Sequence, residues 1–178
     1  MTNMSPTNQQ KLLVMDWARK VHTLEYAHRY ESKDNESRNG FWGNAATVIS
    51  AVVAGIVGLS IADNSEWKTV STGISVVGSM LVAIITGIQT NTKPSEVAEK
   101  HRYSSSSYEE LRHRIEQLLV NHVITADYVM SQLPILERDF EKLRQNTPNV
   151  TDENFKKGKD TVTKLGTYPP AMRFDPIP

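Results

Sequence analysis

The sequence of 178 residues contains no cysteine. Disulfide bonds, iron–sulfur clusters, thiolate zinc sites and thiol nucleophiles are therefore excluded. No excess of either charge is present, because 20 Lys and Arg residues balance 20 Asp and Glu residues. A dedicated nucleic-acid-binding protein usually shows a basic excess, so we expect no nucleic-acid partner.

Sequence signatures of catalysis are also missing. The chain has no Walker A motif, no Gly-x-Ser-x-Gly, no His-Glu-x-x-His and no Gly-x-Gly-x-x-Gly. His101 could join a zinc site across helices, although a polar residue at a helix–helix seam is the commoner role of such a histidine. We therefore expect no catalytic residue, no metal ligand and no cofactor, and we expect that the protein is not an enzyme.

Charge is absent from two long stretches, residues 44–62 and residues 69–92. A helix rises 1.5 Å per residue, so the shorter stretch covers about 28 Å, close to the hydrocarbon thickness of a bilayer. A buried helix of a soluble bundle, which is the alternative, usually carries a charge on its outer face. The sequence therefore predicts an all-α membrane protein whose residues 41–92 form a two-helix transmembrane hairpin.

The basic residues near the two stretches indicate the orientation. The connection at 63–68 contains one basic residue, Lys68, beside two acidic ones. The flanking segments contain three each, namely Arg29, Lys33 and Arg38 before the first stretch, and Lys93, Lys100 and Arg102 after the second. By the positive-inside rule, both termini are expected in the cytoplasm.

The rest of the chain predicts a cytoplasmic helical bundle and a tail. Residues 1–40 read as an amphipathic cytoplasmic helix that ends in a breaker segment at 35–40, and residues 93–146 as further cytoplasmic helices. A seam with spacings of three and four residues runs along the third helix, through His101, Ser104, Tyr108, Leu111, Ile115 and Leu118. Residues 147–178 hold five of the eight prolines, which favours an extended or disordered tail.

Four consecutive serines, residues 104–107, lie on this third helix. They could be phosphorylated, or they could be small residues that let two helices cross closely. We favour the close crossing.

The two apolar stretches each carry a stripe of small residues. In the second stretch, hydroxyl and small residues fall within a sector of about 80° on a helical wheel, namely Thr72, Ser75, Ser79, Ala83, Thr86 and Thr90. In the first stretch the stripe contains Ala51, Gly55 and Gly58. Such stripes serve either close packing of membrane helices or the lining of a hydrated path.

Two helices are too few to enclose water, so a channel requires a homo-oligomer. We assign the stripe of the first stretch to helix packing and that of the second to the pore, while the reverse assignment stays open. Lys93 at the inner mouth and Asp63 or Glu66 at the outer mouth are candidates for charged rings that select ions.

The order of the segments, together with Ala98, His101, Tyr108, Leu111 and Ile115, resembles the SLATT family of two-transmembrane domains that associate with SMODS and SLOG proteins. The resemblance covers roughly residues 10–146. It implies a membrane effector of a nucleotide-signalled conflict system that oligomerises into a pore and kills or arrests an infected cell. Family members are often linked to a nucleotide sensor, but no sensor domain fits in 178 residues. A signal would therefore be sensed by a nucleotide-sensing partner protein, by the short tail, or not at all.

Three functions therefore compete. The first is a homo-oligomeric channel or pore-forming effector whose partners are the lipid bilayer, further copies of the chain and the permeating ions. The second is a membrane-anchored adaptor whose cytoplasmic helices bind a partner protein, and the third is a small membrane enzyme or a subunit of one.

Overall fold

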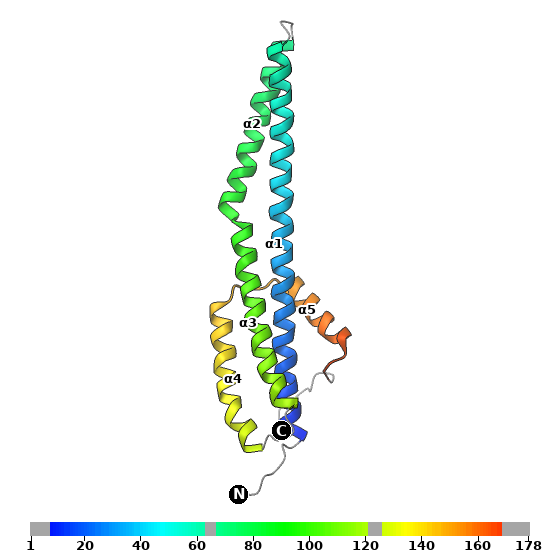
Figure 1. Ribbon diagram of the computed structural model, residues 1–178, viewed down its shortest axis with the longest axis vertical. Coiled ribbons are helices and arrows are strands. Elements are labelled where there is room, and N and C mark those ends of the chain that lie inside the picture. Colours follow the sequence, from blue (N-terminus) through cyan, green and yellow to red (C-terminus); the bar gives the residue numbers. More distant parts are fainter. Residues whose placement is uncertain (1–7, 63–66, 121–125, 169–178) are drawn as a thin grey trace. The chain divides into compact units, whose positions relative to one another are not determined.

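The computed structural model describes residues 8–62, 67–120 and 126–168. Within these ranges the chain is all-α, as predicted, and contains no strand. Figure 1 labels the helices in chain order: α1 (Asn8–Ala62), α2 (Trp67–Thr92), α3 (Pro94–Val120), α4 (Ala126–Asn146) and α5 (Asp152–Leu165).

The chain divides into two compact units. Residues 1–33 and 99–178 form one of them, which we call the packed unit. Residues 34–98 form the other, which we call the apolar unit.

The expected break at residues 35–40 is wrong, because α1 continues through this segment. The segment contains no proline, and Gly40 is its only glycine. One glycine inside a helix costs about 1 kcal/mol. Ending the helix would leave several backbone groups without helical partners, which is less favourable.

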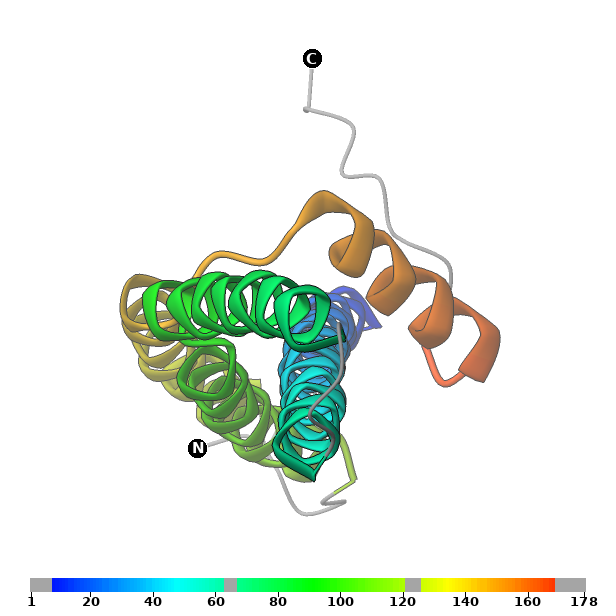
Figure 2. The same ribbon diagram turned by 90° about the horizontal axis from the view of Figure 1, so that it is seen from above.

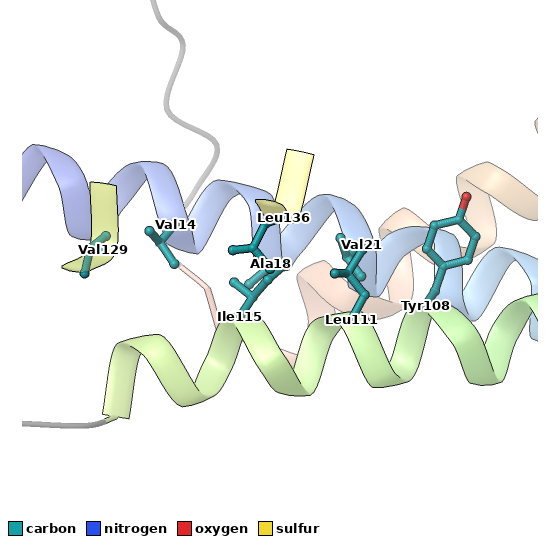
Figure 3. Packing of buried hydrophobic residues seen from close by; sticks show 8 residues of the cluster. All are labelled: Val14, Ala18, Val21, Tyr108, Leu111, Ile115, Val129 and Leu136. Atoms are coloured by element: carbon teal, nitrogen blue, oxygen red, sulfur yellow. The ribbon is translucent and has the colours of Figure 1, made fainter. Parts of the chain in front are cut away.

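Three helices share the core of the packed unit. Figure 3 shows side chains of α1 and α3 that face each other at three- and four-residue spacings, and residues of α4 complete the cluster: Val14, Ala18, Val21, Tyr108, Leu111, Ile115, Val129 and Leu136. The ring of Phe140 on α4 lies edge-on to Trp17 of α1, with 5.6 Å between centroids, and to Tyr108 of α3, at 6.3 Å. Burial of these apolar side chains holds the three helices together.

The expected extended or disordered tail is wrong for Asp152–Leu165, which forms α5. Thr151 caps the start of this helix and accepts a hydrogen bond from the backbone N–H of Asn154, and Gly166 ends it in the left-handed conformation, with φ 64°. All five prolines of the tail lie outside the helical segment. Figure 2 shows α4 and α5 on different sides of the α1 and α3 segments of the packed unit.

A close crossing joins α5 to α1. A Cβ atom on Gly158 would lie 2.7 Å from the backbone oxygen of Thr23 and 3.0 Å from the backbone nitrogen of Ala27. The hydroxyls of Tyr30 and Thr161 are hydrogen-bonded at 2.9 Å. The backbones therefore approach at a distance that only glycine permits.

In the apolar unit, α2 runs against α1 in the opposite direction. A Cβ atom on Gly78 would collide with the side chain of Val53, and the Gln89 amide donates to the backbone oxygen of Asn39 at 3.4 Å. The residues of α2 that are buried or half-buried follow three- and four-residue spacings: Ser71, Ser75, Gly78, Val82, Ile85 and Gln89. We call this row the α1-facing row.

Both helices of the apolar unit expose large apolar side chains. The described stretches Gln10–Gly58 and Thr69–Leu118 each contain a window of 18 residues that is long and apolar enough to cross a membrane. No residue of the first window is buried, and 11% of the second window is buried. The core helix of a soluble protein would be mostly buried, so these windows differ from core helices.

Candidate functional site

The predicted pore-lining stripe lies on an outer face of α2. Thr72, Ser79, Ala83, Thr86 and Thr90 are exposed, and Ser75 is half-buried. At 100° per residue, the stripe is centred about 90° from the α1-facing row. The stripe therefore lies beside the contact with α1.

Some hydroxyls of the stripe are satisfied within the helix. Ser75 donates to the backbone oxygen of Ser71, and Thr90 donates to that of Thr86, both at 2.8 Å. A hydroxyl bonded to the carbonyl four residues earlier needs no water partner. These two groups are therefore compatible with lipid, with a second helix or with a hydrated lumen.

The small stripe of the first span does not pack against α2. Ala51, Gly55 and Gly58 are exposed, and a Cβ atom on either glycine would meet no other atom within 4 Å. The stripe therefore does not form the contact between α1 and α2, and its role in packing against other helices stays a prediction.

The half-buried residues Ile49, Val53 and Ile56 form the α1 side of that contact instead. Gly78 of α2 leaves the space into which Val53 fits, so a branched side chain opposes a glycine there. On α2, Ile85 belongs to the α1-facing row and is 9% exposed.

Of the three residues proposed for the pore mouths, Asp63 and Glu66 lie outside the described residues. Lys93 separates α2 from α3 and adopts a left-handed conformation, with φ 43°. Its exposed ammonium lies 3.2 Å from the carboxylate of Glu96, which offsets the positive charge at this position.

A groove of about 420 Å³ lies between α1 and α2. Its lining is apolar and includes Val52, Val53, Ile74, Val77 and Leu81. On the wheel of α2 the groove lies opposite the hydroxyl stripe. The groove offers no hydrogen-bonding side chain, so its chemistry suits hydrocarbon.

The predicted seam of α3 lies in the packed unit. Tyr108, Leu111 and Ile115 are at most 2% exposed, and His101 is 3% exposed. Leu118 is partly buried and packs against the same core. The three- and four-residue spacing places these side chains on the face of α3 that meets α1 and α4.

The serine run lies where α3 meets α1. Ser104 and Ser105 are buried, and the Ser105 hydroxyl donates to the backbone oxygen of Glu25 at 3.1 Å. The Ser104 hydroxyl donates to the backbone oxygen of Lys100. Their burial favours close helix crossing over modification at these two positions.

A pair of buried histidines joins α1 to α3. The Nδ1 atoms of His28 and His101 are 2.9 Å apart, and Tyr108 stacks on the His28 ring with 5.3 Å between centroids. Burial, and secondarily His101, lower the pKa of His28 to about 4. Burial also lowers the pKa of His101, against the opposing effect of Glu31.

No local sequence pattern predicts the His28–His101 pair. The two residues are 73 positions apart, and each resembles an ordinary polar residue on an amphipathic helix.

An ion network also links α1 to α3. The Arg112 guanidinium donates to the buried carboxylate of Glu25 and to Glu116, both at 2.8 Å. Burial lowers the pKa of Arg112, but these hydrogen bonds outweigh it, so the pKa is raised overall. Tyr168, which follows α5, donates to Glu116 at 2.9 Å.

In the part of the chain that the structure describes, no group of three or more His, Asp or Glu residues could hold a metal ion. Comparison with protein-family models, curated proteins and solved structures found no match.

Proposed function

We propose that the chain is a two-span membrane protein that assembles as a homo-oligomer and conducts ions along the hydroxyl stripe of α2. In this proposal residues 41–92, which include the apolar part of α1 and all of α2, form a transmembrane hairpin, the packed unit is a cytoplasmic bundle, and both termini face the cytoplasm. We also propose the role that the SLATT resemblance implies, a membrane effector controlled by a nucleotide-sensing partner.

The observation that carries the proposal is the two-sided exterior of α2. One exposed face has hydroxyls at Thr72, Ser79 and Thr86, while another exposes Ile74, Val77 and Leu81. In a ring of copies, the hydroxyl face can meet water while the branched apolar face meets lipid. A single α1–α2 pair encloses no such path, so the proposal requires several copies.

The proposal is tested with full-length protein in planar bilayers, where ion current and reversal potential are measured under a salt gradient. The substitutions Ser79→Lys and Leu81→Lys are matched, because both positions are exposed on α2. We expect Ser79→Lys to assemble and to shift the reversal potential toward anion preference, because a hydrated ring tolerates charge. Leu81→Lys should express poorly, since lysine at a lipid-facing helix centre costs about 2.5–3.5 kcal/mol.

Cysteine scanning gives a second readout, because the native chain has no cysteine. Introduced thiols should react with a water-soluble reagent along the stripe. A reactive pattern on the Ile74–Leu81 side of a conducting protein would contradict the assignment of the lumen. An oligomer or monomer without current would favour the membrane-anchored adaptor.

A further inference from the structure

Three titratable side chains are buried where α1, α3 and the start of α5 meet: His28, Glu31 and His101 are all less than a tenth exposed. Two neutral imidazoles whose Nδ1 atoms face each other share one hydrogen, so one ring donates Nδ1–H to the bare Nδ1 of the other. The hydrogen bond therefore fixes the tautomer of each neutral ring: the donor carries its hydrogen on Nδ1, and the acceptor carries its hydrogen on Nε2.

Protonation of this pair proceeds in two different steps. A first proton from solvent can bind the bare Nε2 of the donor ring, and the Nδ1–H···Nδ1 bond then survives with a positive charge. A second proton must bind the accepting Nδ1, after which two N–H groups oppose each other across 2.9 Å. The geometry therefore tolerates at most one added proton.

Glu31 connects the histidines to α5. Its Oε1 accepts a hydrogen bond from the backbone N–H of Thr151 at 2.7 Å and another from the Thr151 hydroxyl. Thr151 is the N-cap of α5. The carboxylate thus holds the first turn of α5 against α1, where the helix dipole also favours a negative charge.

We propose that the His28–His101 pair is a proton-operated latch that, through Glu31, controls the docking of the α5 N-terminus on α1. The first proton creates an imidazolium beside Glu31, and this charge competes with Thr151 for the same carboxylate. The second proton breaks the Nδ1 pair and separates α1 from α3 locally. Acid therefore loosens α5 at its first turn, while Gly158 and Thr161 hold the remainder.

Among the charged groups around the histidine pair, Glu31 is the one that can interact with the imidazolium formed by the first proton. On α1 and α3, the electrostatic influences on His28 come from Glu31 and His101. Tyr108 stacks on His28, and its own pKa is raised by burial and affected by Arg144 and Glu141 of α4. Burial raises the pKa of Glu31, but hydrogen bonds from Thr151 and Asn154 outweigh it, so the pKa of Glu31 is lowered overall.

The lowered pKa of His28 determines how the release of α5 depends on pH. The pKa of His28 is about 4 in the docked state against an ordinary value of 6.5. A released state binds more protons between these values, so release becomes more favourable as the pH falls from 6.5 toward 4. Each ring raises the equilibrium constant for release by at most about tenfold per pH unit.

The test uses the full chain in detergent, with spin labels on cysteines introduced at Lys20 of α1 and Lys156 of α5, both exposed in the packed unit. We expect one narrow distance distribution at pH 7.5, and a broader and longer one as the pH falls below 6. Glu31→Gln keeps an acceptor for Thr151 but removes the charge. This variant should remain docked and should release at a lower pH than the parent, or not at all.

The controls separate the latch from general acid unfolding. His113→Asn changes an exposed histidine on α3, and His22→Asn changes another buried one, and neither should remove the transition. The double variant His28→Asn with His101→Asn should abolish the transition.

If this double variant does not fold, the ¹⁵N chemical shifts of the histidines in the parent are measured against pH instead. Three results would overturn the latch. They are release of α5 in the double histidine variant, an unshifted pH midpoint of release in Glu31→Gln, and independent titration of both rings near pH 6.5. The latch does not depend on the proposed channel function.

Discussion

Gly158 shows how one residue decides the position of a helix. It lies on α5 opposite the backbone of Thr23 and Ala27, and a Cβ atom there would be closer to backbone than packed atoms allow. Backbone atoms of α1 cannot move as freely as the end of a flexible side chain. The docking of α5 therefore depends on the absence of a side chain at this position.

We predict that Gly158→Ala destabilises the packed unit by about 1–3 kcal/mol, the range typical of overpacking. Thermal unfolding followed by circular dichroism measures this change. Lys159→Ala is the control, because residue 159 is exposed on the same helix. Equal melting temperatures for Gly158→Ala and the parent would show that α5 is not held at this crossing.

His22 is a second residue whose burial has a measurable consequence. It is 7% exposed, its Nδ1 atom has no hydrogen-bond partner among the described residues, and Tyr168 contacts its ring edge-on. Burial, and secondarily the positive charge of Arg112, lower the pKa of His22 to about 4. The folded protein therefore keeps this ring neutral where an unfolded chain would protonate it.

We predict that the stability contributed by neutral His22 is complete above pH 6.5 and is lost as the pH falls from 6.5 to about 4, because the unfolded chain binds more protons in this window. His22→Gln should reduce the pH dependence of unfolding there by up to about 1.4 kcal/mol per pH unit. Unfolding midpoints at several pH values measure the slope. His113→Gln, at an exposed site, should leave it unchanged.

At the scale of elements, two helices meet differently in the two units. In the packed unit, α3 presents Tyr108, Leu111 and Ile115 to α1, and large side chains fill the contact. In the apolar unit, α2 presents Gly78 to Val53 of α1. A small residue opposite a branched one allows a close approach, which suits helices that associate by packing in lipid.

We predict that Gly78→Ala weakens the α1–α2 contact, because the added methyl group collides with Val53. Gly73→Ala is the matched control on the same helix, since a Cβ atom there meets no other atom within 4 Å. Thermal stability in detergent should fall for Gly78→Ala alone. It should recover in the double variant with Val53→Ala, and a failure to recover would contradict the contact.

At the scale of the whole molecule, the two units differ in what they leave exposed. In the apolar unit, large apolar side chains such as Val48, Val76, Met80 and Ile84 are more than half exposed. Monomeric soluble proteins rarely expose contiguous apolar patches larger than a few hundred Å². Such a surface is typical of proteins that are covered by lipid or by further protein.

We predict that the termini and the connection at residues 63–66 lie on opposite sides of a membrane. Ser65→Cys should react with an impermeant maleimide on intact cells that express the chain. Lys156→Cys should react only after permeabilisation. Reaction of both cysteines on intact cells would contradict the proposed topology and would move the packed unit outside the cytoplasm.

Local sequence patterns predicted the features that depend on neighbours along the chain. Two stretches without charge predicted the apolar parts of α1 and α2, because hydropathy and length are properties of a segment. The three- and four-residue spacing through Tyr108, Leu111 and Ile115 predicted one buried face of α3. Helical periodicity alone places such residues on one side, whatever the partner.

Tertiary contacts decided the rest. Residues 152–165 contain few apolar residues, and α5 is positioned by Gly158 against α1 and by Glu31 at Thr151, neither of which a local pattern reveals. On a helical wheel, the apolar part of α1 has one side of small residues and another of branched apolar residues. The sequence does not show which side contacts α2, whereas the fit of Val53 over Gly78 shows that it is the branched side. The His28–His101 pair joins residues 73 positions apart, so their unusual environment exists only once α1 and α3 have packed and excluded water.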